Sequence, residues 1–190
     1  MGTMKNTANK SIGIILPIVL FFLFSYASAQ QKQDELRDAE AYNNLGYDYG
    51  QKGQYDLAIA NFTRAIEINP KYATAYNNRG YVYGQKGQYD KAIADYTKAI
   101  EIDPKFDMAY NYRGIAYGQK GQYDLAIADF TKAIEINPRY ATAYNNRGYA
   151  YYFKKEYDKS WEDVKKAQDL GYQIPPKFLE DLRKASGRQN

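Results

Sequence analysis

The amino-acid sequence predicts an all-α protein in which four similar helix–turn–helix units follow one another along the chain. The first observation is a short segment that recurs every 34 residues, as AYNNLGY at 41–47, AYNNRGY at 75–81, AYNYRGI at 109–115 and AYNNRGY at 143–149. The second is helical spacing within each unit, which places residues such as Tyr76, Gly80 and Tyr83 on one arc of a helix. The third is regular punctuation by glycine and proline, which divides each unit into two helical stretches.

The first element of the chain has the three-part layout of a secretory signal peptide. Residues 1–11 are basic, residues 12–24 form an apolar run, and Ala27 and Ala29 fit the small-x-small cleavage rule. We therefore expect residues 1–29 to be removed and the mature protein to be exported, either to the periplasm of a bacterial envelope or out of the cell. The alternative is that this segment is retained as a membrane anchor.

The repeated region begins after a polar lead-in at residues 30–38. Its four units are 39–72, 73–106, 107–140 and 141–174. In the first three units a glycine follows the first helical stretch, where a left-handed C-terminal cap is expected; these are Gly53, Gly87 and Gly121. An aspartate opens every second stretch, where a negative charge suits the helix dipole; these are Asp56, Asp90, Asp124 and Asp158.

This pattern resembles the tetratricopeptide repeat, a helix–turn–helix unit of the same length. The residues that carry the resemblance are Tyr42, Leu45, Gly46, Tyr49, Ala58, Phe62, Ala65 and Pro70 in unit one; Tyr76, Gly80, Tyr83, Ala92, Tyr96, Ala99 and Pro104 in unit two; Tyr110, Gly114, Tyr117, Ala126, Phe130, Ala133 and Pro138 in unit three; and Tyr144, Gly148, Tyr151 and Ala167 in unit four. Arginine stands at 79, 113 and 147, where leucine is usual. The resemblance implies a right-handed solenoid that serves as a non-enzymatic scaffold for protein–protein interaction.

A capping helix and tail are expected at residues 175–190. Phe178, Leu179, Leu182 and Ala185 recur there at helical spacing with charged residues opposite. Because a stack of repeats leaves an apolar face at its end, such a helix would solvate the last unit. Trp161, the only tryptophan, is expected to pack against it.

The resemblance also implies that one arc of each first helix lines a concave groove in which an extended peptide binds. The corresponding residues are Asn43, Asn44, Tyr47, Asn77, Asn78, Tyr81, Asn111, Tyr112, Asn145, Asn146 and Tyr149. Each amide offers an acceptor and two donors, which match the C=O and N–H of a peptide backbone. Two alternatives stay open: the asparagines only hydrogen-bond the neighbouring helix, or they were copied when a unit was duplicated.

Other binding modes, known for this family or suggested by the tyrosines, are alternatives to the peptide groove. Lysine and arginine side chains that grip a C-terminal carboxylate are missing, since the corresponding places hold Asn43, Tyr47, Asn78, Met108 and Tyr112, of which only Asn78 fits. The groove tyrosines could instead stack on sugar rings of an envelope glycan such as peptidoglycan. With the leader retained, the chain would be a membrane-tethered assembly factor.

Composition excludes several classes of function. The chain has neither cysteine nor histidine, so disulfides, thiolate or histidine metal sites and histidine-dependent catalysis are excluded. We expect no enzyme activity, no cofactor and no metal. Acidic residues on the second helices, among them Asp95, Glu101 and Asp129 beside Lys98 and Lys132, are expected to be solvated salt-bridge partners.

The expected partner is a protein or peptide whose identity the sequence does not give. The formal charge is only +4 and no basic stripe is visible, which argues against nucleic acid. Contact with a membrane is expected only through an uncleaved N-terminal segment. Near-identical repeats can also exchange between chains, which leaves self-association open.

Overall fold

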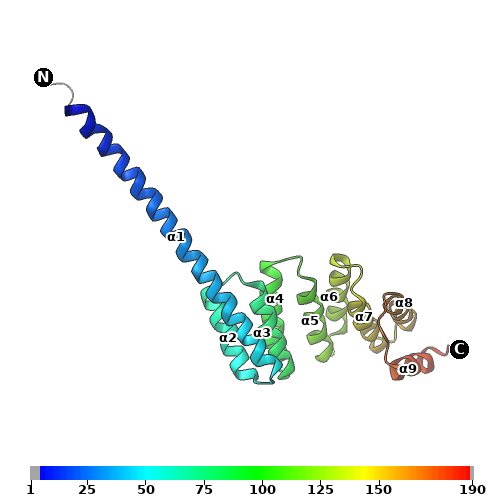
Figure 1. Ribbon diagram of the computed structural model, residues 1–190. Helices are drawn as coiled ribbons and strands as arrows, with labels where there is room; N and C mark the ends of the chain where they lie inside the picture. The colour runs from blue at the N-terminus through cyan, green and yellow to red at the C-terminus, as the bar shows by residue number, and fades with distance from the viewer. Residues whose placement is uncertain (1–4, 189–190) are drawn as a thin grey trace.

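The computed structural model describes the backbone of residues 5–188 and the side chains of residues 21 and 23–188. Within these residues every regular element is a helix. The helices are α1 (Lys5–Gln51), α2 (Tyr55–Ile68), α3 (Ala73–Gln85), α4 (Tyr89–Ile102), α5 (Asp107–Gln119), α6 (Tyr123–Ile136), α7 (Ala141–Phe153), α8 (Tyr157–Asp169) and α9 (Pro176–Ser186). Helices α1 to α8 form consecutive hairpins that stack side by side, and α9 closes the stack (Figure 1). The predicted all-α repeat architecture is confirmed.

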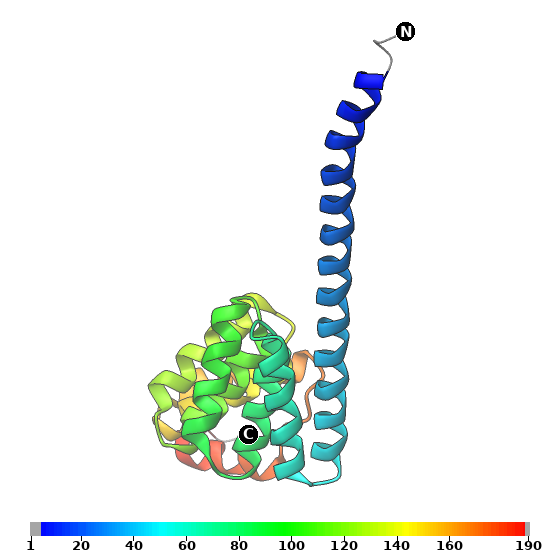
Figure 2. The same ribbon diagram turned by 90° about the vertical axis from the view of Figure 1, so that its left-hand side faces the viewer.

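Helix α1 is far longer than the others because it continues from the leader through the lead-in into the first helix of unit one. Its C-terminal part packs against α2, and its N-terminal part extends away from the stack in both views (Figures 1 and 2). The helix therefore continues without a break from the leader into the repeats.

The predicted leader is described only in part. Ala27 and Ala29 lie exposed on the projecting part of α1. Residues 1–4 of the basic portion lie outside the described residues, as do the side chains of residues 5–20 and 22. Of the apolar run, the described side chains are Phe21, Leu23 and Phe24, which are exposed. In the part of the chain that the structure describes, no helix is both long enough and apolar enough to span a membrane. Cleavage after Ala29 stays a prediction.

The turn inside each hairpin requires a left-handed backbone. Gly53, Gly87 and Gly121 have φ of 72°, 70° and 72°, which confirms the expected caps. In unit four the equivalent residue is Lys155, whose φ is 62°. An L-residue with a side chain is strained in this region by roughly 1–2 kcal/mol, so the turn of unit four is the costliest of the four.

The two helices of a hairpin approach closely at one glycine. A Cβ added to Gly46, Gly80 or Gly114 would lie 2.8, 2.9 or 2.7 Å from the ring of Phe62, Tyr96 or Phe130, respectively. Each ring is buried, and fully buried alanines flank it on the second helix. In unit four, buried Ser160 stands where the first three units have a buried alanine. Its hydroxyl donates a 2.8 Å hydrogen bond to the Gly148 carbonyl.

Helix α9 covers the last unit as the apolar pattern predicted. Phe178 and Leu182 join Val164, Ala167 and Ile174 in a buried cluster. Trp161 packs at its edge, and its Nε1 donates to Ser186 Oγ at 3.1 Å. Helix α9 thus acts as a cap because it buries apolar side chains of α8.

Candidate functional site

Arginines on the first helices join each unit to the one before. Arg79 donates from Nε and Nη2 to the two carboxylate oxygens of Asp95, at 2.8 Å each, and from Nη1 to Thr63 Oγ1 of the preceding unit at 2.9 Å. The same contacts recur for Arg113 with Asp129 and Thr97, and for Arg147 with Asp163 and Thr131. A guanidinium matches a carboxylate bidentately, so arginine here connects three helices where leucine is usual.

The prediction that Asp95 and Asp129 are solvated partners of lysine is therefore wrong. They are only 7% and 6% exposed and pair with arginine, because they face the neighbouring first helix. Glu101 does pair with Lys98 on the surface, at 2.9 Å. The missed signal was present in the sequence: unit one changes both positions together, with Leu45 and Asn61 replacing the arginine and aspartate.

The paired asparagines have two different positions. The first of each pair is buried, with 6%, 4%, 1% and 4% of Asn43, Asn77, Asn111 and Asn145 exposed. The second reaches back to the preceding unit: Asn78 Nδ2 donates to Asn43 Oδ1 at 3.1 Å, and Asn146 Nδ2 donates to Asn111 Oδ1 at 3.0 Å. Asn44, which has no unit before it, is exposed.

One boundary lacks this amide contact. Unit three has Tyr112 where units two and four have the second asparagine, and no hydrogen bond reaches Asn77 Oδ1 although this atom is buried. Asn145 Oδ1 is also unpaired, because α9 rather than a further repeat follows unit four. The amides Asn43 and Asn78 of units one and two, and Asn111 and Asn146 of units three and four, thus serve repeat packing.

The groove is formed by three adjoining hollows along the first helices. Tyr81, Gln85 and Tyr112 line the first and second hollows, and Ile115 and Gln119 line the second and third. Shared walls make the hollows one continuous surface from unit one to unit four, which we call the groove.

The predicted groove tyrosines differ in exposure. Tyr47 and Tyr81 are 55% and 44% exposed. Tyr112 is half-buried and lies against Tyr81 and Tyr96, with ring centroids 5.4 and 5.9 Å apart. Tyr149 stacks on Phe178 of α9 with centroids 3.6 Å apart, so the cap occupies one of its faces.

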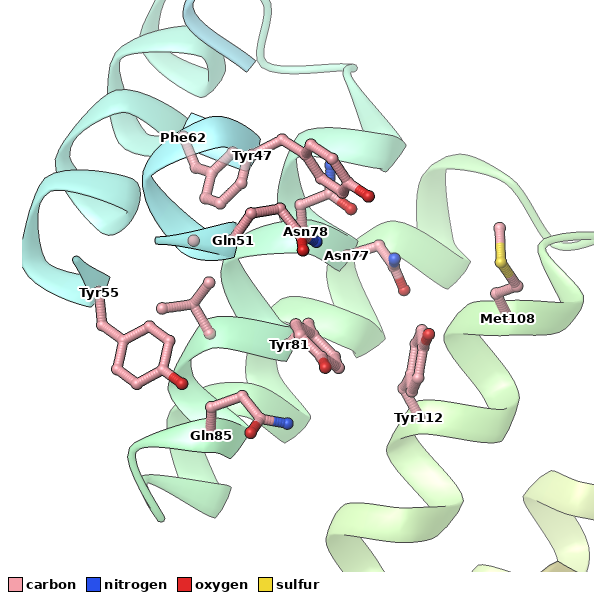
Figure 3. A pocket seen from close by; sticks show the side chains of 12 residues that line it. Tyr47, Gln51, Tyr55, Phe62, Asn77, Asn78, Tyr81, Gln85, Met108 and Tyr112 are labelled. Carbon is pink, nitrogen blue, oxygen red and sulfur yellow. The ribbon is translucent and has the colours of Figure 1, made fainter. Parts of the chain in front are cut away.

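The hollow at units one to three has a volume of about 440 Å³. Its walls are Tyr47, Gly50, Gln51, Tyr55, Phe62, Asn77, Asn78, Tyr81, Val82, Gln85, Met108 and Tyr112, and Figure 3 shows the aromatic rings and amides around it. None of these side chains carries a charge. The hollow can therefore hold apolar groups and neutral hydrogen-bonding groups, whereas a buried ion would find no counter-charge.

Burial raises the pKa of three tyrosine hydroxyls in units two and three. It raises the pKa of Tyr96 far above its usual value, with a smaller contribution from Tyr112. Burial also raises the pKa of Tyr112 and, together with Tyr112 and Asp107, that of Tyr140 to about 12. Among the described side chains, no group of three acidic residues is placed to hold a metal ion.

Family comparisons agree with the repeat architecture. Models of the tetratricopeptide repeat match residues 73–106 and 108–140, and a further one matches 130–162. A model described as TPR repeat matches 46–87. No curated protein matches the chain.

Solved structures of the same fold are similar to this chain. The Arabidopsis OM64 TPR domain is 30% identical with a TM-score of 0.60, over 61% of this chain and 96% of that one. A crystal structure of MamA is 26% identical with a TM-score of 0.65, over 80% and 82%. The first TPR of Spaghetti (RPAP3), bound to the HSP90 peptide SRMEEVD, is 28% identical with a TM-score of 0.57, over 60% and 90%. The chain belongs to the tetratricopeptide repeat family.

Proposed function

We propose that this chain is an exported, non-enzymatic scaffold that binds extended peptide segments of protein partners in the groove. The observation that carries the proposal is the continuous groove, whose walls expose large apolar side chains. Tyr47, Tyr81, Met108, Ile115 and Phe153 are between 36% and 55% exposed there. Burial of such side chains against a ligand supplies most of the binding free energy in peptide recognition.

The similar structure of Spaghetti with a bound peptide supports a peptide ligand. The chemistry recognised must differ, because that peptide is acidic and the hollow at units one to three has uncharged walls. A partner with apolar and neutral polar side chains fits this surface better than an acidic tail.

A peptide is favoured over a glycan because the tyrosines do not form a row of free rings. Tyr112 lies against two other tyrosines and Tyr149 stacks on Phe178. Of the four predicted groove tyrosines, Tyr47 and Tyr81 are the most exposed, and the ring of Tyr81 already lies against Tyr112.

A pair of double variants tests the binding surface. Tyr81→Lys with Ile115→Lys places charges in the groove. Leu57→Lys with Leu125→Lys places them at residues that are each 48% exposed on second helices and outside all three hollows. In-cell crosslinking with mass spectrometry should recover partners roughly tenfold less with the groove variant and equally with the control. Equal recovery with both variants would overturn the proposal.

Export is tested separately by the mass of the mature N-terminus. Removal of residues 1–29 gives a chain that begins at Gln30. An intact N-terminus in the membrane fraction would instead make the protein a tethered scaffold.

A further inference from the structure

The boundary between units two and three differs from the boundaries on either side of it. At those two, an asparagine Nδ2 of one unit donates to the buried asparagine Oδ1 of the unit before. The third such acceptor, Asn77 Oδ1, has no hydrogen-bond partner although only 4% of the residue is exposed. Leaving a buried acceptor unpaired costs free energy, which a donor from a ligand would recover.

Asn77 lines the hollow at units one to three, and its unpaired oxygen is buried behind the wall of that hollow. In Figure 3 the hydroxyl end of Tyr112 points toward its amide, and Met108 lines the same hollow from the helix that carries Tyr112. Asn145, whose Oδ1 is also unpaired, lines none of the three hollows. Only Asn77 therefore combines an unpaired acceptor with a place in the groove.

Access to the oxygen depends on side chains that can move. Asn77 Oδ1 is covered, and a ligand reaches it only after a neighbour shifts. Met108 is 44% exposed and carries a flexible, unbranched side chain in the wall of the same hollow. Its displacement breaks no hydrogen bond or ion pair.

The protein itself shows one kind of donor that fits this acceptor. At the equivalent positions the donor is a side-chain carboxamide, at 3.1 and 3.0 Å. The walls of the hollow are uncharged, which disfavours an ammonium as donor, and a carboxylate has no proton to donate. Gln51 and Gln85 add further amides around the same space.

We propose that the groove binds its partner peptide through an asparagine or glutamine side chain, whose amide N–H donates to Asn77 Oδ1 and replaces the contact that Tyr112 interrupts. This inference rests on the proposed peptide-binding function. An apolar residue next to the carboxamide packs against Val82, Phe62 and Met108 in the same hollow. The specificity is thus for a neutral amide beside an apolar side chain.

The test supplies the missing amide within the protein. In Tyr112→Asn, the new side chain occupies the position of Asn78 and Asn146 and should donate to Asn77, which raises the melting temperature and closes the site. Tyr112→Leu is the matched control, because leucine resembles asparagine in shape but has no donor. The probes are dye-labelled, acetylated and amidated peptides GGFNGG, GGFDGG and GGFAGG, titrated against the full chain by fluorescence anisotropy.

We expect the native chain and Tyr112→Leu to bind GGFNGG roughly tenfold more tightly than GGFDGG or GGFAGG, and Tyr112→Asn to lose this preference. Equal affinity for the three probes, no binding of any of them, or a preference that survives in Tyr112→Asn would overturn the inference.

The two proposals fail in different ways. If the carboxamide preference is absent but the Tyr81 and Ile115 variant still loses its partners, the groove binds peptides by other contacts. If the preference is present and depends on residue 112 but the groove variant keeps every partner, the hollow accepts carboxamides and the proposed function is overturned.

Discussion

Arg113 donates two hydrogen bonds, each 2.8 Å long, to the carboxylate of Asp129, and the two side chains are only 17% and 9% exposed. A charge pair so far from water is stable only while both members are present. Unit one, with Leu45 and Asn61 at the same places, shows that the fold also accepts a neutral pair.

Removal of one member of the ion pair should therefore cost more than removal of both. Arg113→Leu leaves Asp129 buried without its partner, and we expect a loss of about 3 kcal/mol in the free energy of unfolding. Arg113→Leu with Asp129→Asn copies unit one and should recover at least half of that loss. Urea denaturation followed by circular dichroism measures both. A double variant no more stable than the single one would show that the charge itself is not the cause.

Two glycines of helix α5 should respond to alanine in opposite directions. A Cβ at Gly114 would lie 2.7 Å from the Phe130 ring, so Gly114→Ala should destabilise by about 1–3 kcal/mol. A Cβ at Gly118 meets nothing within 4 Å, so Gly118→Ala should stabilise by up to about 1 kcal/mol through helix propensity. Melting temperatures of the two variants decide the point, and a shift of the same sign in both would contradict it.

The turn of unit four should be improvable. Lys155 has φ of 62°, so Lys155→Gly removes strain and should stabilise the chain by about 1 kcal/mol. Gly121, the equivalent residue of unit three, has φ of 72° and provides the reverse control, since Gly121→Ala should destabilise by a similar amount. Unchanged stability in Lys155→Gly would mean that the left-handed turn carries no strain.

Stability should fall in alkaline solution. Burial raises the pKa of Tyr140 from 10.0 to about 12, so the folded state holds this proton more firmly than the unfolded state. The resulting stabilisation is complete below pH 10 and is lost as the pH rises toward 12. Tyr140→Phe should lose stability less steeply across this window. Unfolding at a series of pH values, with tyrosinate absorbance recorded alongside, tests it; identical pH dependence in both proteins would refute the assignment.

The repeat fold was predictable because each hairpin specifies itself locally. Gly46 and Gly80 leave room for an aromatic ring from the second helix of the same unit. Gly53 and Gly87 allow the left-handed turn between the two helices. Such requirements appear in the sequence at a fixed period and need no knowledge of distant contacts.

The polar contacts between units could not be predicted in the same way. The partner of Asn78 is Asn43, 35 residues earlier, and this pairing depends on how two hairpins are offset in the stack. The sequence interpretation assigned both asparagines of each pair to the groove; in the structure the first of each pair is buried, and of these residues only Asn77 lines one of the three hollows. Similarly, helical spacing predicted Asp95 to be a surface residue, because its partner Arg79 lies on the other helix of the hairpin, 16 residues earlier.

The presence of Tyr112, where units two and four have an asparagine, has a consequence for how a long ligand would align with the solenoid. A strictly periodic surface offers several equivalent registers, each displaced by one repeat, and an extended chain bound there could slide between them. Because the boundary of units two and three alone combines a tyrosine with an unpaired buried amide oxygen in the groove, the registers are no longer equivalent. A single residue that differs among near-identical repeats thus distinguishes one alignment of a bound chain from the others.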